Sequence, residues 1–247
     1  MITIYNTEVV GWEAAIRGMR NPLESWNKSD SSYCNPLTKC YSDCEKHECE
    51  VRDHFALGPN DFGLMMRLRN AGTDHRKFMR MIVVYVDILA PLYWWKEFDT
   101  YRAGVKYLDN PNPFDIEVNS CSTMHKIAAK EFTLEDFSHE HLNVWSLNIL
   151  KSTVERLNRS RNIYLYGGFT YDENDKYVQF EPKSKYIWWQ MIQLLPSSYN
   201  QKRTVMLNYE VLANIYKSRK DHKLDEWRKL CDWIRELPYS ELITGED

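Results

Sequence analysis

The chain has 247 residues with 43% hydrophobic content, enough for one sizeable domain that buries a core without disulfide support. Its net charge of −3 argues against a surface built for duplex nucleic acid. Asp87 and Pro91 interrupt the most apolar run, and the N-terminus lacks the pattern of a signal peptide. We therefore expect a cytoplasmic protein with neither a duplex nucleic acid nor a membrane as partner.

The first half of the chain alternates strand and helix patterns. Residues 2–20 predict a strand followed by a helix, and a polar excursion follows over residues 33–58. A helix is predicted from Gly58 to Gly72, where apolar residues recur at helical spacing. Residues 78–88 form a continuous run rich in β-branched side chains, which predicts a buried strand.

The second half is mainly helical. A long amphipathic helix is predicted over residues 138–161, followed by a turn-rich stretch over 164–180 that reads either as a hairpin or as a flexible loop. Pro196 ends the next predicted helix. Residues 203–220 keep their apolar side chains in helical register and predict a helix, and residues 224–242 predict the last one.

Four of the six cysteines form a cluster: Cys34, Cys40, Cys44 and Cys49. Closely spaced thiolates can converge on zinc, although this spacing is not the usual pair of CxxC motifs. The cluster is also compatible with reduced thiols in an exposed loop, which the polar surroundings favour. Disulfides are the third alternative, and a cytoplasmic context argues against them.

The segment over residues 90–127 combines aromatic, charged and hydroxyl side chains. Trp94 and Trp95 stand beside charged residues, and a polar run over residues 119–126 follows a Pro- and Asn-rich interruption. Aromatic faces next to such groups suit a planar polar ligand, with Tyr93 and Tyr101 as further rings. The alternative is that these aromatics belong to the core or to a subunit interface.

Two segments resemble the flavin-dependent thymidylate synthases of the ThyX type, over about residues 60–235. The family carries a Leu-Pro pair followed by Asn and Arg on one helix, and here Leu195-Pro196 is followed by Asn208 and Arg219. Residues 97–102 take the place of the family signature Gln-x-x-Arg-His-Arg, of which only the last residue survives, as Arg102. The family's Asn-Glu-x-Ser-x-Arg-Tyr is matched by residues 119–125.

The resemblance implies an α+β fold in which a central antiparallel sheet is flanked by long helices. It implies one domain over residues 1–247, with a Cys-rich excursion at 33–58 and an insert at 105–117. It further implies FAD as cofactor, NADPH and methylenetetrahydrofolate as co-substrates, a pyrimidine deoxynucleotide as substrate, and a homotetramer with sites between subunits.

The same resemblance assigns site residues. It implies that five residues bind the cofactor: Thr100, Tyr101, Arg102, Asn208 and Arg219. It implies that six residues bind the substrate: Glu97, Asn119, Ser122, Thr123, His125 and Lys126. The alternative for the charged residues is a solvated or structurally paired side chain, and for the Ser122 segment it is a capped helix start.

Departures from the family fall on the phosphate site. The family's phosphate-binding arginines align with Met124, Ile192 and Glu210, and each lost charge-assisted bond is worth roughly 1.5–3 kcal/mol. We expect Glu210 to add repulsion, and substitute charge to come from four residues: His125, Lys126, Lys202 and Arg203. An altered enzyme is therefore predicted. The alternatives are an inactive nucleotide- or flavin-binding protein of the same fold and an assembly protein without a ligand.

Overall fold

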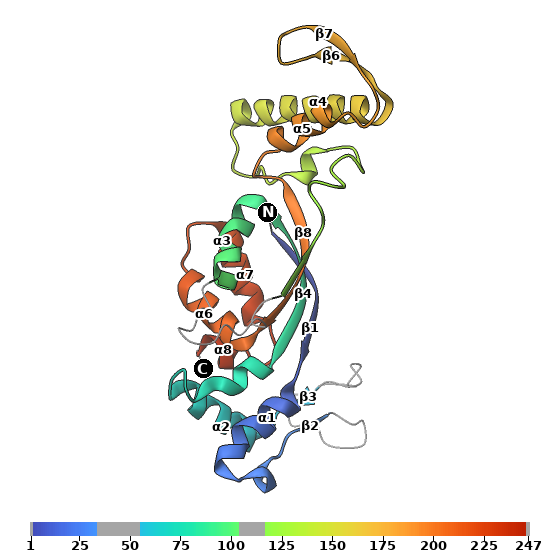
Figure 1. The fold of residues 1–247 in the computed structure, drawn as a ribbon. Helices are drawn as coiled ribbons and strands as arrows, with labels where there is room; N and C mark the ends of the chain where they lie inside the picture. Colours follow the sequence, from blue (N-terminus) through green and yellow to red (C-terminus); the bar gives the residue numbers. More distant parts are fainter. Residues whose placement is uncertain (1, 34–54, 104–116, 246–247) are drawn as a thin grey trace, which may run out of the picture. The chain divides into compact units, whose positions relative to one another are not determined.

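The computed structural model describes residues 2–33, 55–103 and 117–245 (Figure 1). The chain divides into two compact units. Unit 1 consists of Met1–Tyr5, Asp87–Gly104 and Val118–Thr204. Unit 2 consists of Asn6–Val86, Val105–Glu117 and Val205–Asp247. The Cys-rich excursion and the expected insert lie mainly outside the described residues, including all four clustered cysteines.

The central β structure is a four-stranded antiparallel sheet with the order β1-β4-β8-β5 (Figure 1). Its strands are β1 (Thr3–Val10), β4 (Val83–Pro91), β5 (Glu117–Ser120) and β8 (Asn200–Asn208). Alternate residues of β4, namely Val84, Val86, Ile88 and Ala90, are buried, as expected for the inward face of a strand. The α+β fold with a central antiparallel sheet is therefore confirmed.

Unit 2 is built from short helices around a buried aromatic core. Its elements are α1 (Trp12–Arg20), η1 (Asn21–Leu23), η2 (Trp26–Lys28), β2 (Ser32–Tyr33), β3 (Phe55–Ala56), α2 (Pro59–Asn70), η3 (Arg76–Met81), α6 (Tyr209–Arg219), α7 (Asp225–Arg235) and α8 (Glu241–Thr244). Helix α6 packs against η3, α7 and α8. The rings of Tyr209 and Tyr239 meet Trp12 edge-on, with centroids 5.4 and 5.3 Å away.

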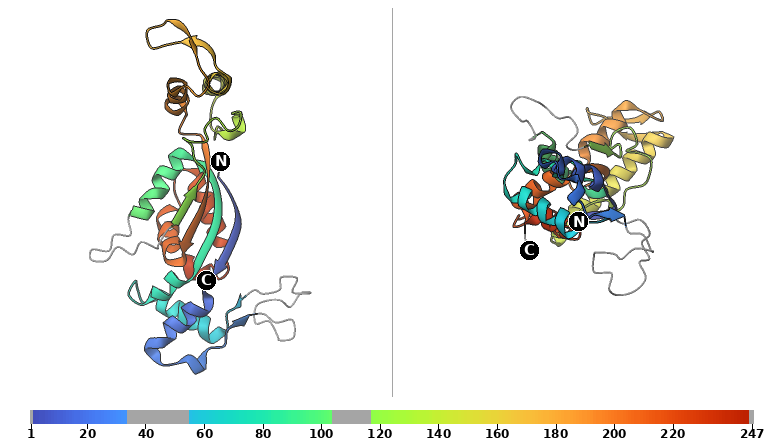
Figure 2. Two further views of the ribbon diagram at one scale, coloured as in Figure 1. Left: turned by 45° about the vertical axis from the view of Figure 1, so that its right-hand side comes forward. Right: turned by 90° about the horizontal axis from the view of Figure 1, so that it is seen from below.

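Unit 1 contains a pair of helices joined through a hairpin. Its elements are α3 (Leu92–Ala103), η4 (Leu134–Asp136), α4 (Val144–Tyr166), β6 (Gly168–Tyr171), β7 (Tyr177–Phe180) and α5 (Lys185–Leu194). Helices α4 and α5 lie side by side, and Figure 2 (left) shows them almost end-on. Gly167 has φ +75°, a left-handed conformation that ends α4 and turns the chain into β6. Of the two predicted alternatives for this stretch, the hairpin is confirmed.

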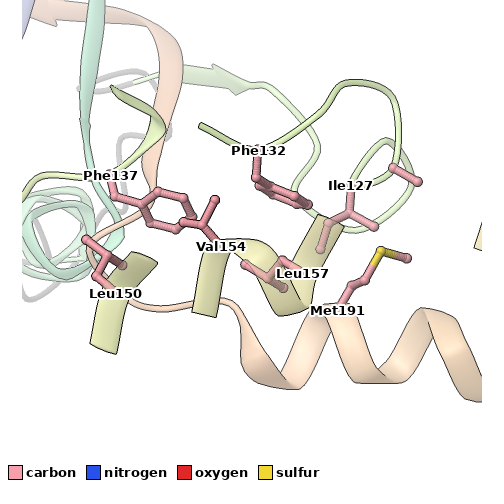
Figure 3. Close-up of a cluster of buried hydrophobic side chains, with 8 residues drawn as sticks. Ile127, Phe132, Phe137, Leu150, Val154, Leu157 and Met191 are labelled. Carbon is pink, nitrogen blue, oxygen red and sulfur yellow. The ribbon is translucent and has the colours of Figure 1, made fainter. Parts of the chain in front are cut away.

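A hydrophobic cluster holds α4 and α5 to the preceding segment (Figure 3). Its buried members are Ile127, Ala128, Phe132, Phe137, Leu150, Val154, Leu157 and Met191. They come from α4, from α5 and from residues 127–137, so one cluster ties three parts of unit 1 together. Burial of apolar surface is the main stabilising term in such an arrangement.

Replacing Leu157 by Ala should lower the free energy of unfolding by about 2–5 kcal/mol, because its fully buried side chain would leave a cavity in this cluster. Urea unfolding followed by circular dichroism measures the change. The matched control is Ile149→Ala on the same helix, at a side chain that is 70% exposed, where we expect less than about 0.5 kcal/mol. Equal losses in both variants would contradict the packing described here.

Three predicted elements are wrong in detail. Residues 203–208 belong to strand β8 and not to a helix, since burial at Gln201, Val205 and Leu207 follows the period of a strand. Residues 78–81 lie in the 3-10 helix η3, because the β-branched run starts only at Ile82. The last predicted helix is divided into α7 and α8 around Pro238, which cannot continue a helix.

Candidate functional site

Unit 1 contains a pocket of about 250 Å³ at the start of β8, which we call the Ser122 pocket. It is lined by Leu89, Cys121, Ser122, Thr123, Lys130, Glu135, Asp136, Tyr199, Asn200, Gln201 and Lys202. Two predicted substrate-binding residues, Ser122 and Thr123, are therefore brought together here. They share the pocket with Lys202, which was expected to supply positive charge, and with hydroxyl, amide and charged groups that the sequence did not indicate.

Hydrogen bonds fix the segment that carries Ser122. The backbone N–H of Cys121 donates to the Lys202 carbonyl at 3.0 Å, and the Gln201 side chain donates to the Cys121 carbonyl at 2.7 Å. The Ser122 hydroxyl oxygen accepts from the backbone N–H of His125 at 2.9 Å. This contact closes a turn and does not cap a helix, because residues 123–130 form bends and turns, so the capped helix start given above as the alternative is not formed. A hydroxyl that accepts in this way still has its own proton to donate to a ligand.

Both lysines of the Ser122 pocket are paired with carboxylates. Lys130 donates to Asp136, and this hydrogen bond raises the pKa of Lys130. The Lys202 ammonium lies 3.1 Å from Asp87, and hydrogen bonds to Tyr5 and Asp87 raise the pKa of Lys202. Each lysine therefore stays charged at neutral pH but has its charge compensated. A phosphate group would find little excess positive charge in this pocket.

The two adjacent tryptophans are core residues of unit 1. Trp94 and Trp95 are fully buried and pack with Phe98 at ring-centroid distances of 5.0 and 5.2 Å. The Arg203 guanidinium stacks over the Trp95 ring at 4.3 Å and pairs with Asp99 at 2.8 Å. The interpretation of Trp94 and Trp95 as a platform for a planar ligand is therefore wrong, and Arg203 is not a source of uncompensated charge.

Other predicted residues of unit 1 lie outside the Ser122 pocket. On helix α3, the Thr100 hydroxyl donates to the Glu97 carbonyl at 2.6 Å, and Tyr101 is half-buried. The side chain of Arg102 lies outside the described residues. Three further substrate-binding candidates are exposed and do not line the pocket: Asn119, His125 and Lys126.

In unit 2, two predicted cofactor-binding residues have local structural contacts. The amide oxygen of Asn208 caps α6 by accepting from the Val211 N–H at 2.9 Å. The Arg219 guanidinium lies over the Trp227 ring, 4.9 Å from its centroid. These contacts position both side chains at the two ends of α6.

Glu210 does not act as the repulsive group predicted from the sequence. This residue, only 5% exposed, accepts a hydrogen bond from Arg76 at 3.3 Å and another from Arg80. Two guanidinium groups therefore compensate one carboxylate. That expectation was wrong because the compensating arginines lie about 130 residues earlier in the chain.

The cysteine cluster Cys34, Cys40, Cys44 and Cys49 lies outside the described residues, so zinc binding there stays a prediction. Within the part that the structure describes, no group of three or more His, Cys, Asp and Glu side chains could hold a metal ion. Among the described helices, none combines the length and the apolar character needed to cross a bilayer.

Most residues of the Ser122 pocket were missed by the sequence analysis. Tyr199 follows Pro196 after two serines and comes just before β8, and Asn200 and Gln201 begin this strand. A polar Ser-Ser-Tyr-Asn-Gln run after a helix-ending proline was the available signal. Strand β8 was not predicted, because residues 203–220 were assigned to a helix.

No family profile and no curated protein matches this sequence. Solved structures do match it. A thymidylate synthase X (ThyX) from Helicobacter pylori with FAD and dUMP has a TM-score of 0.58 at 14% identity, over 99% of this chain and 98% of that one. A second structure of the Helicobacter pylori enzyme with FAD and dUMP gives the same TM-score at 15% identity, over 98% of each chain. The chain therefore has the fold of the flavin-dependent thymidylate synthases, as the resemblance in its sequence implied.

Proposed function

We propose that this chain is a ThyX-like flavin-dependent enzyme that transfers a one-carbon unit to a pyrimidine deoxynucleotide and has an altered phosphate site. The observation that carries the proposal is the fold, shared over nearly the whole of both chains with a ThyX structure holding FAD and dUMP. NADPH and methylenetetrahydrofolate would be the co-substrates, and the cytoplasm the place of action.

The Ser122 pocket is the proposed nucleotide site. Its volume of about 250 Å³ lies below the range of about 300–1,000 Å³ for small-molecule sites, so it suits one pyrimidine ring better than a three-ring isoalloxazine. Asn200 uses its amide oxygen to accept from Ser138 at 2.8 Å, which leaves the amide N–H₂ group to donate. With the Ser122 hydroxyl, this amide offers donors to the carbonyl oxygens of a uracil-like base.

The flavin would supply hydride transfer when bound. The resemblance assigns its binding to Thr100, Tyr101 and Arg102 in one segment and to Asn208 and Arg219 in another. Asn208 fits such a role in part, because its cap occupies only the amide oxygen. We also propose that the protein is a homotetramer, in which neighbouring subunits complete each flavin site.

Flavin binding is the first test. Purified full-length protein should show flavin absorbance bands that denaturation releases into solution, or should take up added FAD in calorimetry. The flavin proposal fails if the protein is colourless and titration with FAD gives no heat. Size-exclusion chromatography with light scattering tests the tetramer separately.

Turnover is the second test, with tritium release from 5-labelled dUMP and dCMP in the presence of methylenetetrahydrofolate and NADPH. If Ser122 holds the nucleotide, Ser122→Ala should raise KM about tenfold, the effect of losing one hydrogen bond of about 1–1.5 kcal/mol. Ser120→Ala, at an exposed position outside the pocket, is the matched control. A flavin-bound protein that releases no tritium from either nucleotide would instead be the inactive binding protein.

A further inference from the structure

Unit 2 contains a second pocket, of about 180 Å³, whose lining includes four cationic side chains and no carboxylate. We call it the basic pocket. It is lined by Arg69, Arg76, Ala213, Asn214, Tyr216, Lys217, Lys220, Ile243 and Thr244. Arg69 lies on α2, Arg76 on η3 and Lys217 on α6, and Lys220 is the residue that follows α6. Cationic side chains from separate elements therefore line one pocket.

Arg69 is held in the basic pocket by contacts with the C-terminal end of α8. Its Nε donates to the Leu242 carbonyl at 3.1 Å and its Nη2 to the Ile243 carbonyl at 3.2 Å. Gly245 has φ +72°, and a Cβ there would lie 2.2 Å from Nη2 of Arg69. The guanidinium thus fits against a glycine in a conformation that other residues rarely adopt.

Arg76 is held in the basic pocket by two contacts with α6. Its Nε contacts Glu210 at 3.3 Å, and its Nη2 donates to the Asn214 amide oxygen at 3.2 Å. Glu210 is shared with Arg80, so this carboxylate cannot neutralise both arginines. Arg76 therefore lines the pocket with a counter-charge that it shares with Arg80.

Like charges are crowded here. Burial lowers the pKa of Arg69, and the nearby positive charge of Arg76 lowers it further. Lys217 on α6 and Lys220, the C-cap residue of α6, add two ammonium groups three residues apart, and the helical backbone of Lys220 places them on the same side. A bound anion would relieve this repulsion and accept hydrogen bonds from both kinds of cation.

We propose that the basic pocket binds the phosphate group of a small molecule. Guanidinium forks and ammonium groups from several elements match the oxygens of one phosphate, and a pocket of about 180 Å³ is small enough to be filled by one such group. The proposal concerns phosphate chemistry alone and does not depend on flavin binding or on turnover. Inorganic phosphate and a nucleotide share this chemistry, and the experiment separates the two sources.

The experiment is calorimetric titration of the full-length protein with inorganic phosphate, dUMP and deoxyuridine in a phosphate-free buffer at constant ionic strength. We expect saturable binding of inorganic phosphate, and about a tenfold weaker affinity for each lysine removed in Lys217→Gln and Lys217→Gln/Lys220→Gln. Lys223→Gln, an exposed lysine outside the pocket, should bind as the unaltered protein does. Thermal unfolding of each variant verifies that it is folded.

The arms of the titration give distinct results. Tighter binding of dUMP than of inorganic phosphate, weakened by the same lysine variants, identifies a nucleotide phosphate as the occupant. Binding of inorganic phosphate without dUMP identifies the free anion. No binding of inorganic phosphate at about 10 mM, equal affinity in all variants, or equal affinity for dUMP and deoxyuridine without binding of inorganic phosphate would overturn the proposal. This titration measures neither flavin content nor tritium release. The phosphate proposal can therefore fail while the proposed function holds, and the reverse is also true.

Discussion

Replacing Asp61 by Asn is expected to lower the free energy of unfolding by about 3–5 kcal/mol, the cost of breaking a buried ion pair from one side. The Asp61 carboxylate is fully buried, and its Oδ1 lies 2.6 Å from Nε of Arg20. Its Oδ2 accepts from the hydroxyls of Ser29 and Ser31 and from the backbone N–H of Asp30 and Ser31. The amide in Asp61→Asn would place its own N–H₂ group opposite some of these donors. It would also leave the buried guanidinium of Arg20 without its counter-charge.

Guanidinium chloride unfolding measures this effect, with Asp74→Asn at an exposed carboxylate as the matched control. We expect the control to change the free energy of unfolding by less than about 0.5 kcal/mol. A loss below about 1 kcal/mol in Asp61→Asn would show that the carboxylate does not organise this part of unit 2.

The same carboxylate predicts how stability depends on pH. Burial alone would raise the pKa of Asp61, but hydrogen bonds from Ser31, Ser29, Arg20 and the Asp30 N–H outweigh it and hold the pKa below its ordinary value. Stability from Asp61 is therefore fully present above the unfolded-state pKa of about 3.9 and is lost as the pH falls toward the folded-state pKa. The unaltered protein should lose more stability below about pH 4 than Asp61→Asn does.

Glu210→Arg restores the residue type that the ThyX resemblance implies at this position, yet it should destabilise the protein by at least about 3–5 kcal/mol. The new guanidinium would lie beside Arg76 and Arg80, which now share the Glu210 carboxylate. Three cations would then meet at a site where residue 210 is 5% exposed. Thermal and urea unfolding measure the loss.

The charge-reversed double variant Glu210→Arg/Arg80→Glu is the sharper comparison. It restores an acidic partner between two arginines, so it should recover at least about 1 kcal/mol relative to Glu210→Arg. Glu236→Arg, at an exposed carboxylate after α7, is the control for adding an arginine to unit 2. No recovery in the double variant would mean that charge is not what links these residues.

The secondary structure could be predicted where local signals agreed. Helix α2 starts at Pro59, directly after Gly58, as expected, because proline suits the first helical position, where its missing N–H costs no hydrogen bond. Strand β8 could not be separated from α6 by periodicity, since Leu207 and Val211 are four residues apart, the spacing of one helical face, although they lie in β8 and α6 respectively. The deciding signal was Asn208, whose amide caps the helix that follows the strand.

The sites depend on contacts between distant residues, which no local pattern reveals. Ser122 and Thr123 were indicated by a motif, but Gln201 meets Cys121 across 80 positions of sequence. Arg76 meets Glu210 across 134 positions. Whether an aromatic side chain is exposed or buried is likewise set by the packing of distant elements, so Trp94 and Trp95 looked like ligand-binding rings.

The short pair β2–β3 has a consequence for how this protein tolerates change during evolution. Ser32 pairs with Ala56 and Tyr33 with Phe55, so two stretches of unit 2 that are separated in the sequence lie side by side. Asp61 fixes residues 29–31 just before β2. The entropy cost of closing a loop rises only by about 0.6 kcal/mol for each doubling of its length. Because the β2–β3 pairing and the contacts of Asp61 hold the described residues on both sides, changing the number of residues between Tyr33 and Phe55 is expected to cost little stability.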